Sequence, residues 1–597
     1  MRRVDSQIRG FAVCRPGPEG PGGRRTWRVY KARPALLLLC VLSLAGGVMY
    51  GQARSAPDWT TTGFDAQRSS WVRVDPFISM ESLPKFQFLW KLKLDNESRF
   101  GNSLTAPVAL GNLMTFRGFK SLIFVGGSSN NVYAIDYDFG TVFWRTHHNY
   151  AAGAREFAGS ANCPGGMTIP LTRATSLNPP TQLAFFGFAR PPRPAKGDVG
   201  EPGKGAPQLA EIAERIAARG RSQRGGSDTA ANAPASAAPG ATAGKPNAPN
   251  APAAPSRGAP PPARGVTPQS AREGGRAPNF VFSVAADGLL RGLIPDTGDL
   301  ALAPARFLPA NATATGLIWA DGFVYAATTN TCGGAPEAVW AMDFSAEAKP
   351  VIAWETDGAP IAGIALGTDG TVYAATGNGT SPYANSLVAL DGRTLKVKDW
   401  IRQDSAFTSA PAVFTDGEKT YVAVTSGSRL YVLNGASLGG GDHRTPLGVI
   451  ADAGLRFSGD SLATWRDAAG ARWILGEVSG SVAGFKVSDK TGSLSIERAW
   501  TSRPMTSPRT PIIVNGVVFA LSGGLPAVAP PGAEARGNAS TNAVLYVLDP
   551  ATGKELWNSG NTITSPASAG LAAGTGQVYV VTSDNTVWSF GIPLAIN

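Results

Sequence analysis

A short strand pattern that recurs along the chain constrains its fold more than any other feature. An aromatic residue follows a turn and is itself followed by small residues, with regular copies at Tyr325, Tyr373 and Tyr421, in two steps of 48 residues. Further copies contain Phe124, Phe282, Phe519 and Tyr579. A period of this length suits one four-stranded sheet, so the pattern predicts an array of repeated blades.

Each copy continues into a second pattern, in which a strand, an acidic turn and a strand ending in Trp follow one another. The clearest copies are NNVYAIDYDFGTVFW, SLVALDGRTLKVKDW and VLYVLDPATGKELW, which end at Trp144, Trp400 and Trp557. Asp stabilises such a turn, and Gly accepts a positive φ within it. The Trp can bury a large flat ring between neighbouring blades.

The repeats predict an all-β fold of eight four-stranded antiparallel blades. Their starts are placed near Leu104, Gly166, Ala312, Ala362, Thr408, Gly459, Thr506 and Ser565. The last blade ends at VWSFGIPL without an outer strand, whereas FQFLWKLKL, which contains Trp90, has the outer-strand pattern but no blade of its own. We therefore expect this N-terminal strand to close an eight-bladed β-propeller, which removes the open sheet edge.

The positive charge of the chain lies outside these repeats. The formal net charge is +11, but residues 1–56 contribute +8 and residues 188–277 contribute +7, which leaves −4 for the rest. A mildly acidic folded body does not favour nucleic-acid binding. No nucleic-acid partner is therefore expected.

Two segments fall outside the expected propeller, which comprises residues 57–188 and 277–597. Residues 1–56 have the organisation of a signal peptide and leader: a basic region, an apolar run from Ala35 to Met49, and small residues that allow cleavage after Ala53. The run is shorter than the roughly 20 residues that span a bilayer. We expect a periplasmic or secreted protein with no stable membrane span after cleavage; an uncleaved anchor is the alternative. Residues 189–276, rich in Ala, Pro, Gly and Arg, predict a disordered insertion within blade two.

With these AxDxxTGxxxW-like copies, the chain resembles the quinoprotein dehydrogenase superfamily over roughly residues 58–594, outside the insertion. The resemblance implies an eight-bladed propeller whose enzymes hold pyrroloquinoline quinone (PQQ), usually with Ca²⁺, on the ring axis. The same PQQ repeats also build non-catalytic proteins, such as scaffold lipoproteins of outer-membrane assembly, so the fold alone does not imply turnover. Two features of the enzymes, adjacent cysteines and a CxxCH haem-attachment motif, do not occur in this sequence.

Two cysteines, Cys163 and Cys332, remain after the leader. In a propeller, the loops that lead into each blade and those that join its second and third strands open on one face, the mouth of the central channel. Cys163 falls in the leading loop of blade two, and Cys332 falls in the second-to-third loop of blade three. We therefore expect a disulfide between neighbouring blades; free thiols or redox chemistry are the alternative.

The same loops supply the candidate binding residues. These are Asn102, Arg155, Glu156, Asn162, Asn330, Asn378, Asp404, Arg456 and Arg509. Most of them suit turn formation or loop tethering, whereas Arg456 and Arg509 present planar forks to an anionic ligand. His147 and His148 are interpreted as loop histidines, because adjacent residues of an extended segment point in opposite directions, and no metal site is expected.

These observations predict an exported PQQ-repeat propeller that binds a protein, glycan or small-molecule ligand at its mouth, as a binding or scaffold protein without an assigned catalytic residue. The alternative is a PQQ- and calcium-dependent quinoprotein dehydrogenase that oxidises an alcohol or sugar. The sequence contains no Walker-type phosphate loop, no HExxH and no GxSxG in a strand-turn-helix setting. Nucleotide hydrolysis, zinc-dependent proteolysis and esterase chemistry therefore have no support.

Overall fold

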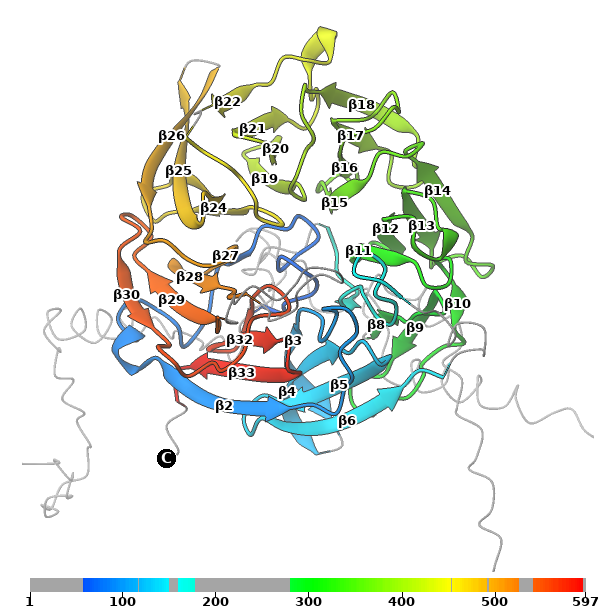
Figure 1. The fold of residues 1–597 in the computed structure, drawn as a ribbon, viewed down its shortest axis with the longest axis vertical. Helices are drawn as coiled ribbons and strands as arrows, with labels where there is room; N and C mark the ends of the chain where they lie inside the picture. Colours follow the sequence, from blue (N-terminus) through cyan, green and yellow to red (C-terminus); the bar gives the residue numbers. More distant parts are fainter. Residues whose placement is uncertain are drawn as a thin grey trace, which may run out of the picture. The chain divides into compact units, whose positions relative to one another are not determined.

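The computed structural model describes residues 57–115, 117–149, 159–177, 280–451, 454–490, 493–525 and 541–593. They form eight antiparallel blades arranged in a ring, so the predicted eight-bladed all-β propeller is confirmed (Figure 1). The expected leader, residues 1–56, and the expected insertion, residues 189–276, lie outside the described residues.

Each blade begins with a strand on the inside of the ring and ends with a strand on its outside. Blade one contains β3 (Val108–Thr115), β4 (Gly118–Gly126), β5 (Asn131–Asp136) and β6 (Thr141–His147), and blade two contains β7 (Thr172–Arg173), β8 (Val281–Val284), β9 (Leu289–Leu293) and β10 (Ala305–Arg306). Blade three contains β11 (Thr313–Ala320), β12 (Phe323–Thr329), β13 (Ala338–Asp343) and β14 (Val351–Glu355). Blade four contains β15 (Ile361–Leu366), β16 (Val372–Thr376), β17 (Ser386–Leu390) and β18 (Val397–Arg402).

The remaining blades follow the same plan, with two contributions from the N-terminal part of the chain. Blade five contains β19 (Ala412–Asp416), β20 (Lys419–Ser426), β21 (Arg429–Asn434) and β22 (Gly448–Ala451), and blade six contains β23 (Ala463–Arg466), β24 (Arg472–Val478), β25 (Ser481–Lys490) and β26 (Ser493–Thr501). Blade seven contains β27 (Pro508–Val514), β28 (Val517–Ser522), β29 (Val544–Leu548) and β30 (Glu555–Asn558). Blade eight contains β31 (Ala572–Gly574), β32 (Gln577–Thr582) and β33 (Thr586–Gly591). Strand β2 (Gln87–Lys93) completes blade eight, and β1 (Trp71–Val72) adds a short parallel strand to blade seven.

The core lies between the blades, and the strand sequences reflect this position. In blade four the two middle strands, VYAAT and SLVAL, are buried at every residue, because both faces of the sheet pack against neighbouring blades. Among the described residues, helical structure is confined to three-residue 3₁₀ turns: η1 (Leu83–Lys85), η3 (Cys332–Gly334) and η4 (Gly440–Asp442). None of these is long enough to cross a membrane.

In several blades the outer-strand Trp packs on the acidic turn of the next blade, whereas the outer strands of blades two and five contain no Trp. Trp144 of blade one donates its Nε1–H to the carbonyl of Pro295 in blade two, at 2.8 Å, and Trp500 of blade six donates to the carbonyl of Pro550 in blade seven, at 3.0 Å. In the second turn, Asp549 Oδ1 accepts hydrogen bonds from the amides of Ala551 and Thr552. The Asp therefore shapes the turn on which the Trp of the preceding blade packs.

The same contact closes the ring. Strand β2 pairs antiparallel with β33, and its Trp90 donates to the carbonyl of Tyr137 in blade one, at 2.8 Å. Gly140 of this turn has φ +59°, and a Cβ there would lie 2.5 Å from the Trp90 ring. Only glycine allows this approach, both for its left-handed backbone and for the missing side chain. The predicted closure by the strand that contains Trp90 is confirmed.

Residues 58–75, which we call the axial segment, run once around the inside of the ring in blade order. The bonded pairs, from blade one to blade eight, are Trp59 with Ala109, Thr60 with Arg173, Thr61 with Leu317, Ala66 with Leu366, Gln67 with Val413, Ser69 with Thr464, Ser70 with Ile513 and Asp75 with Gly576. Most of these bonds join main-chain groups, so the polar backbone of the segment is satisfied inside the protein. No pattern in the sequence predicted this course, which places a part of the chain inside the channel (Figure 1).

Replacement of Trp90 by Ala should weaken the closing contact and lower the free energy of unfolding by about 2–3 kcal/mol, because a large, partly buried ring and its hydrogen bond are lost. Gly140→Ala, which acts on the other side of the same contact, should cost about 1–3 kcal/mol. Equilibrium unfolding in urea measures both changes. Lys93→Ala serves as the control, because Lys93 lies in the same strand as Trp90 and forms only an exposed ion pair with Asp584. An equal, small effect of all three substitutions would show that this contact does not hold the ring closed.

Candidate functional site

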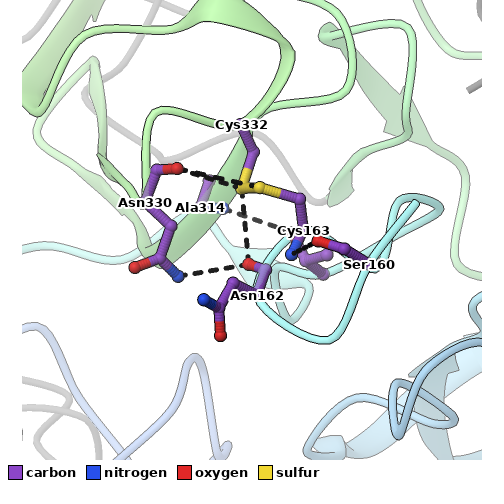
Figure 2. Close-up of a disulfide and its surroundings, with 7 residues drawn as sticks. Ser160, Asn162, Cys163, Ala314, Asn330 and Cys332 are labelled. Atoms are coloured by element: carbon purple, nitrogen blue, oxygen red, sulfur yellow. Dashed lines mark hydrogen bonds between the residues drawn. A yellow bond between two sulfur atoms is a disulfide. The ribbon is translucent and has the colours of Figure 1, made fainter. Parts of the chain in front are cut away.

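The mouth face, defined by the loops that lead into each blade and those that join second to third strands, is braced by a disulfide. Cys163 precedes β7 of blade two, Cys332 lies between β12 and β13 of blade three, and the structure joins them with an S–S distance of 2.09 Å (Figure 2). The bridge closes a stretch with a sequence separation of 169 residues. Two neighbouring blades are thus covalently linked on this face.

Asn162 and Asn330 surround this disulfide. The side-chain amide of Asn330 donates to the carbonyl of Asn162 at 3.3 Å (Figure 2). The Cys332 sulfur also contacts the Asn162 carbonyl, at 3.4 Å. Asn330 has a left-handed φ of +65°, which Asn tolerates better than most residues. These two candidates therefore shape and tether the loops.

The other candidates from the sequence do not converge on one point. Asn378 is exposed, Asp404 forms an exposed ion pair with Arg444 at 3.2 Å, and the main-chain amide of Arg456 donates to the Ser479 hydroxyl. Arg155 and Glu156 lie outside the described residues. Asn102 donates to the carbonyls of Gly165 and Met167, which ties the leading loops of blades one and two together.

Arg509 is the candidate that the structure places in a charged group. It lies at the inner strand of blade seven, 3.6 Å from Asp460 of the loop leading into blade six. Its Nε atom is buried and has no hydrogen-bond partner. Glu477 of β24 completes this group, which we call the mouth cluster: Asp460, Glu477 and Arg509. Neither acid was predicted as a site residue, because Asp and Glu are ordinary surface residue types and only the ring brings these two together with Arg509 of blade seven.

Glu477 is the most perturbed acid of the mouth cluster. Its side chain is buried, and Ser458 donates a hydrogen bond to Oε1 at 2.5 Å. Burial raises the pKa of Glu477, the nearby charge of Asp460 raises it further, and Ser458 and Arg509 act in the opposite direction. A buried acid beside an arginine is a candidate ligand-binding group.

The mouth cluster does not fit PQQ with Ca²⁺. Ca²⁺ takes six to eight oxygen ligands, whereas the described residues contain no group of three or more His, Cys, Asp and Glu side chains that could hold a metal ion. PQQ is an acidic quinone, but Arg509 already faces the carboxylate of Asp460. The carboxyl group of Glu477 is also close to Arg509, so the two acids of the cluster oppose the binding of a further anion. No oxidation step is therefore assigned to these residues.

The interpretation of both histidines as solvated loop residues is wrong for His148, which is buried, and His147 is the last residue of β6. His147 Nδ1 lies 2.9 Å from Asn131 Oδ1, and His148 Nε2 lies 2.9 Å from the Ser283 hydroxyl of blade two. Burial, aided by the positive charge of Arg291, lowers the pKa of His148 to about 3. The imidazole of His148 is therefore neutral and forms part of the boundary between blades one and two.

His148 should make the protein sensitive to acid. Its pKa is about 3 in the folded protein and about 6.5 when exposed, so between these values only the unfolded state binds the proton, and stability falls as the pH falls. Between pH 7 and pH 4 this costs about 3 kcal/mol. His148→Gln should reduce the acid-induced loss by that amount in urea unfolding at the two pH values, whereas His147→Gln should retain it. An unchanged pH dependence in His148→Gln would refute this role.

The disulfide should stabilise the native ring. Replacing Cys163 and Cys332 together by Ser should lower the free energy of unfolding by about 2–4 kcal/mol, because the unfolded chain regains the freedom that the closed loop removes. Dithiothreitol should reproduce this loss in the wild type and change nothing in the double variant. Intact mass before and after reduction checks that the bond is present; a wild type without the two-proton difference would contradict it.

Comparisons with known proteins agree with the repeat pattern. A sequence family described as outer membrane protein assembly factor BamB matches residues 497–592, which include blades seven and eight. Among curated protein sequences, none matches the chain significantly.

Solved structures show the likeness of fold over most of the chain. The quinohemoprotein alcohol dehydrogenase ADHIIG from Pseudomonas putida HK5 is similar with a TM-score of 0.50 and 11% identity, over 90% of this chain and 81% of that one. The quinohemoprotein alcohol dehydrogenase from Comamonas testosteroni has a TM-score of 0.48 and 13% identity, over 92% and 82% of the two chains. BamB from Moraxella catarrhalis has a TM-score of 0.34 and 14% identity, over 53% and 80%. The chain thus has the fold of an eight-bladed β-propeller, and its last two blades match the sequence model of a PQQ-repeat family.

Proposed function

We propose that this protein is an exported propeller that binds another protein on its mouth face and acts as a binding or scaffold protein. The main observation that supports this proposal is the course of the axial segment. Residues 58–75 bond to the inner strands of blades one to seven and to the turn after β31 of blade eight, so the interior of the ring is partly filled by the chain itself. Recognition of a large partner then falls to the loops around the mouth, which are the usual sites of function on a rigid scaffold.

The leading loop of blade one offers a binding group of its own. Arg99 and Asn102 bond to each other through their main chains, which places Phe100 at the tip of a tight hairpin. Phe100 is 53% exposed and has a φ of +46°, a conformation that costs a bulky residue about 1–2 kcal/mol. An exposed aromatic side chain held in a strained backbone is typical of a functional position. We infer that Phe100 contacts the partner.

The hairpin is fixed to the ring on both sides. Asn96 donates to Asn585 of blade eight at 2.7 Å, and Asn102 donates to the leading loop of blade two. A rigid hairpin loses little conformational entropy on binding, which favours affinity. The match of blades seven and eight to a family described as an outer membrane protein assembly factor supports a protein partner. The expected leader at residues 1–56 supports a periplasmic or secreted location for this function.

The alternative function is a quinoprotein dehydrogenase, which the likeness of fold supports although the mouth cluster does not fit PQQ with Ca²⁺. Addition of PQQ and Ca²⁺ to the leaderless protein, followed by absorption spectra and dye reduction with alcohols and sugars, separates the two functions. Saturable binding with turnover would support the dehydrogenase and refute a purely scaffolding role.

Phe100→Asn should weaken partner binding about tenfold or more, since an exposed aromatic at the centre of an interface commonly contributes more than 1 kcal/mol. The substitution keeps the left-handed turn, which Asn tolerates, so urea unfolding should be unchanged. Crosslinking to proteins of the cell envelope, followed by titration of the captured protein, measures the affinity.

The matched control is Phe119→Asn. Phe119 is 72% exposed and begins β4, beside the turn from β3, on the face opposite the mouth. We expect its variant to bind the partner as the wild type does. Equal binding by both variants would overturn the assignment of Phe100, and equal loss in both would point to exposed aromatic residues in general.

A further inference from the structure

The axial segment carries an arginine into the interior of the ring. Arg68 is 4% exposed and has a left-handed φ of +55°. Its Nε–H donates to the carbonyl of Ile364 in blade four, at 2.6 Å. A Cβ added to Gly316 of blade three would lie 3.0 Å from Arg68 Nη2, so the guanidinium group lies against the inner strands of two blades.

The charge of Arg68 has no close counter-ion. Within the described part of the chain, no carboxylate lies within 4.0 Å of the guanidinium group, and its Nη1 and Nη2 atoms donate no hydrogen bond. Burial lowers the pKa of Arg68 to about 10, and Asp460 acts on it only through a longer-range attraction. A buried charge without a partner is costly, and proteins retain such groups mainly where they serve a function.

A second arginine stands on the other side of Asp460. Arg509 of blade seven lies 3.6 Å from that carboxylate, and its buried Nε has no hydrogen-bond partner. Asp460 is thus the acid that acts on both cations, although its own side chain is 75% exposed. Four blades and the axial segment thus place two arginines with unused donors near the exposed carboxylate of Asp460.

We propose that the interior of the ring binds a small oxyanion, a carboxylate or a phosphate, through the Nη1 and Nη2 groups of Arg68, with Arg509 as the second cation. This inference is independent of the protein partner proposed for the mouth face. With Nε engaged by Ile364, the free edge of the guanidinium group presents two N–H donors side by side, which matches two oxygens of one carboxylate or phosphate group. Asp460 competes with such a ligand for both arginines.

Thermal unfolding and isothermal calorimetry with inorganic phosphate and with succinate, at constant ionic strength and pH 7, test this proposal. The wild type should show saturable stabilisation by at least one of the two anions relative to chloride, and their ranking distinguishes phosphate from carboxylate. Arg68→Met should abolish this stabilisation. Because the variant removes a buried, unpaired charge, its melting temperature without added anion should equal or exceed that of the wild type. If Arg68 had only a structural role, its replacement would lower the melting temperature.

Two further variants keep the test decisive if Arg68→Met does not fold. Arg68→Lys retains the charge but lacks the fork, and it should bind the preferred anion at least tenfold more weakly. Asp460→Asn removes the competing acid and should bind it several-fold more tightly. Arg444→Met, which changes an exposed arginine on the outer surface, is the matched control and should behave as the wild type. Absence of saturable stabilisation in the wild type, or stabilisation that persists in the Arg68 variants, would overturn the proposal.

Discussion

The packing of an outer-strand Trp on the turn of the next blade is the contact on which the ring depends. Each blade has two apolar faces, and only its neighbours can bury them, so a single open boundary would expose two sheets. The contact between Trp90 and the turn that contains Gly140 differs from the others only in its origin, because its Trp comes from the N-terminal end of the chain. The repeats are therefore held together by the same interaction that joins the two ends of the ring.

Closure by an N-terminal strand also explains how the axial segment is placed. Residues 58–75 bond to seven inner strands and to the β31–β32 turn before the chain reaches β2 on the outside of blade eight. A segment that lies inside the ring must satisfy its main-chain polar groups there, and the exposed edges of the inner strands supply the partners. The same segment carries Arg68 into a place that water reaches poorly. The burial of this charge is thus a direct consequence of how the ring is filled.

Two surfaces with different properties result from this architecture. The mouth face has covalently braced loops and an exposed aromatic hairpin tip at Phe100, which suits a large partner. The interior has the buried Arg68, with Asp460 and the partly exposed Arg509 of the mouth cluster near it, which suits a small anion. The described residues contain no group of three or more His, Cys, Asp and Glu side chains that could hold a metal ion. The fold alone does not decide between recognition and redox chemistry.

The sequence by itself determined the blade architecture, the number of blades, the closing strand with Trp90 and the two loops that carry the cysteines, because the repeat period and the Trp, Asp and Gly positions are local signals. For the site it identified Arg509, but not Asp460, Glu477 or Arg68. Only the tertiary structure decided how these residues meet, since ring closure brings together positions that are far apart in the chain. The course of the axial segment was equally hidden, because most of its bonds to the blades join main-chain groups, and such bonds leave no pattern in the sequence.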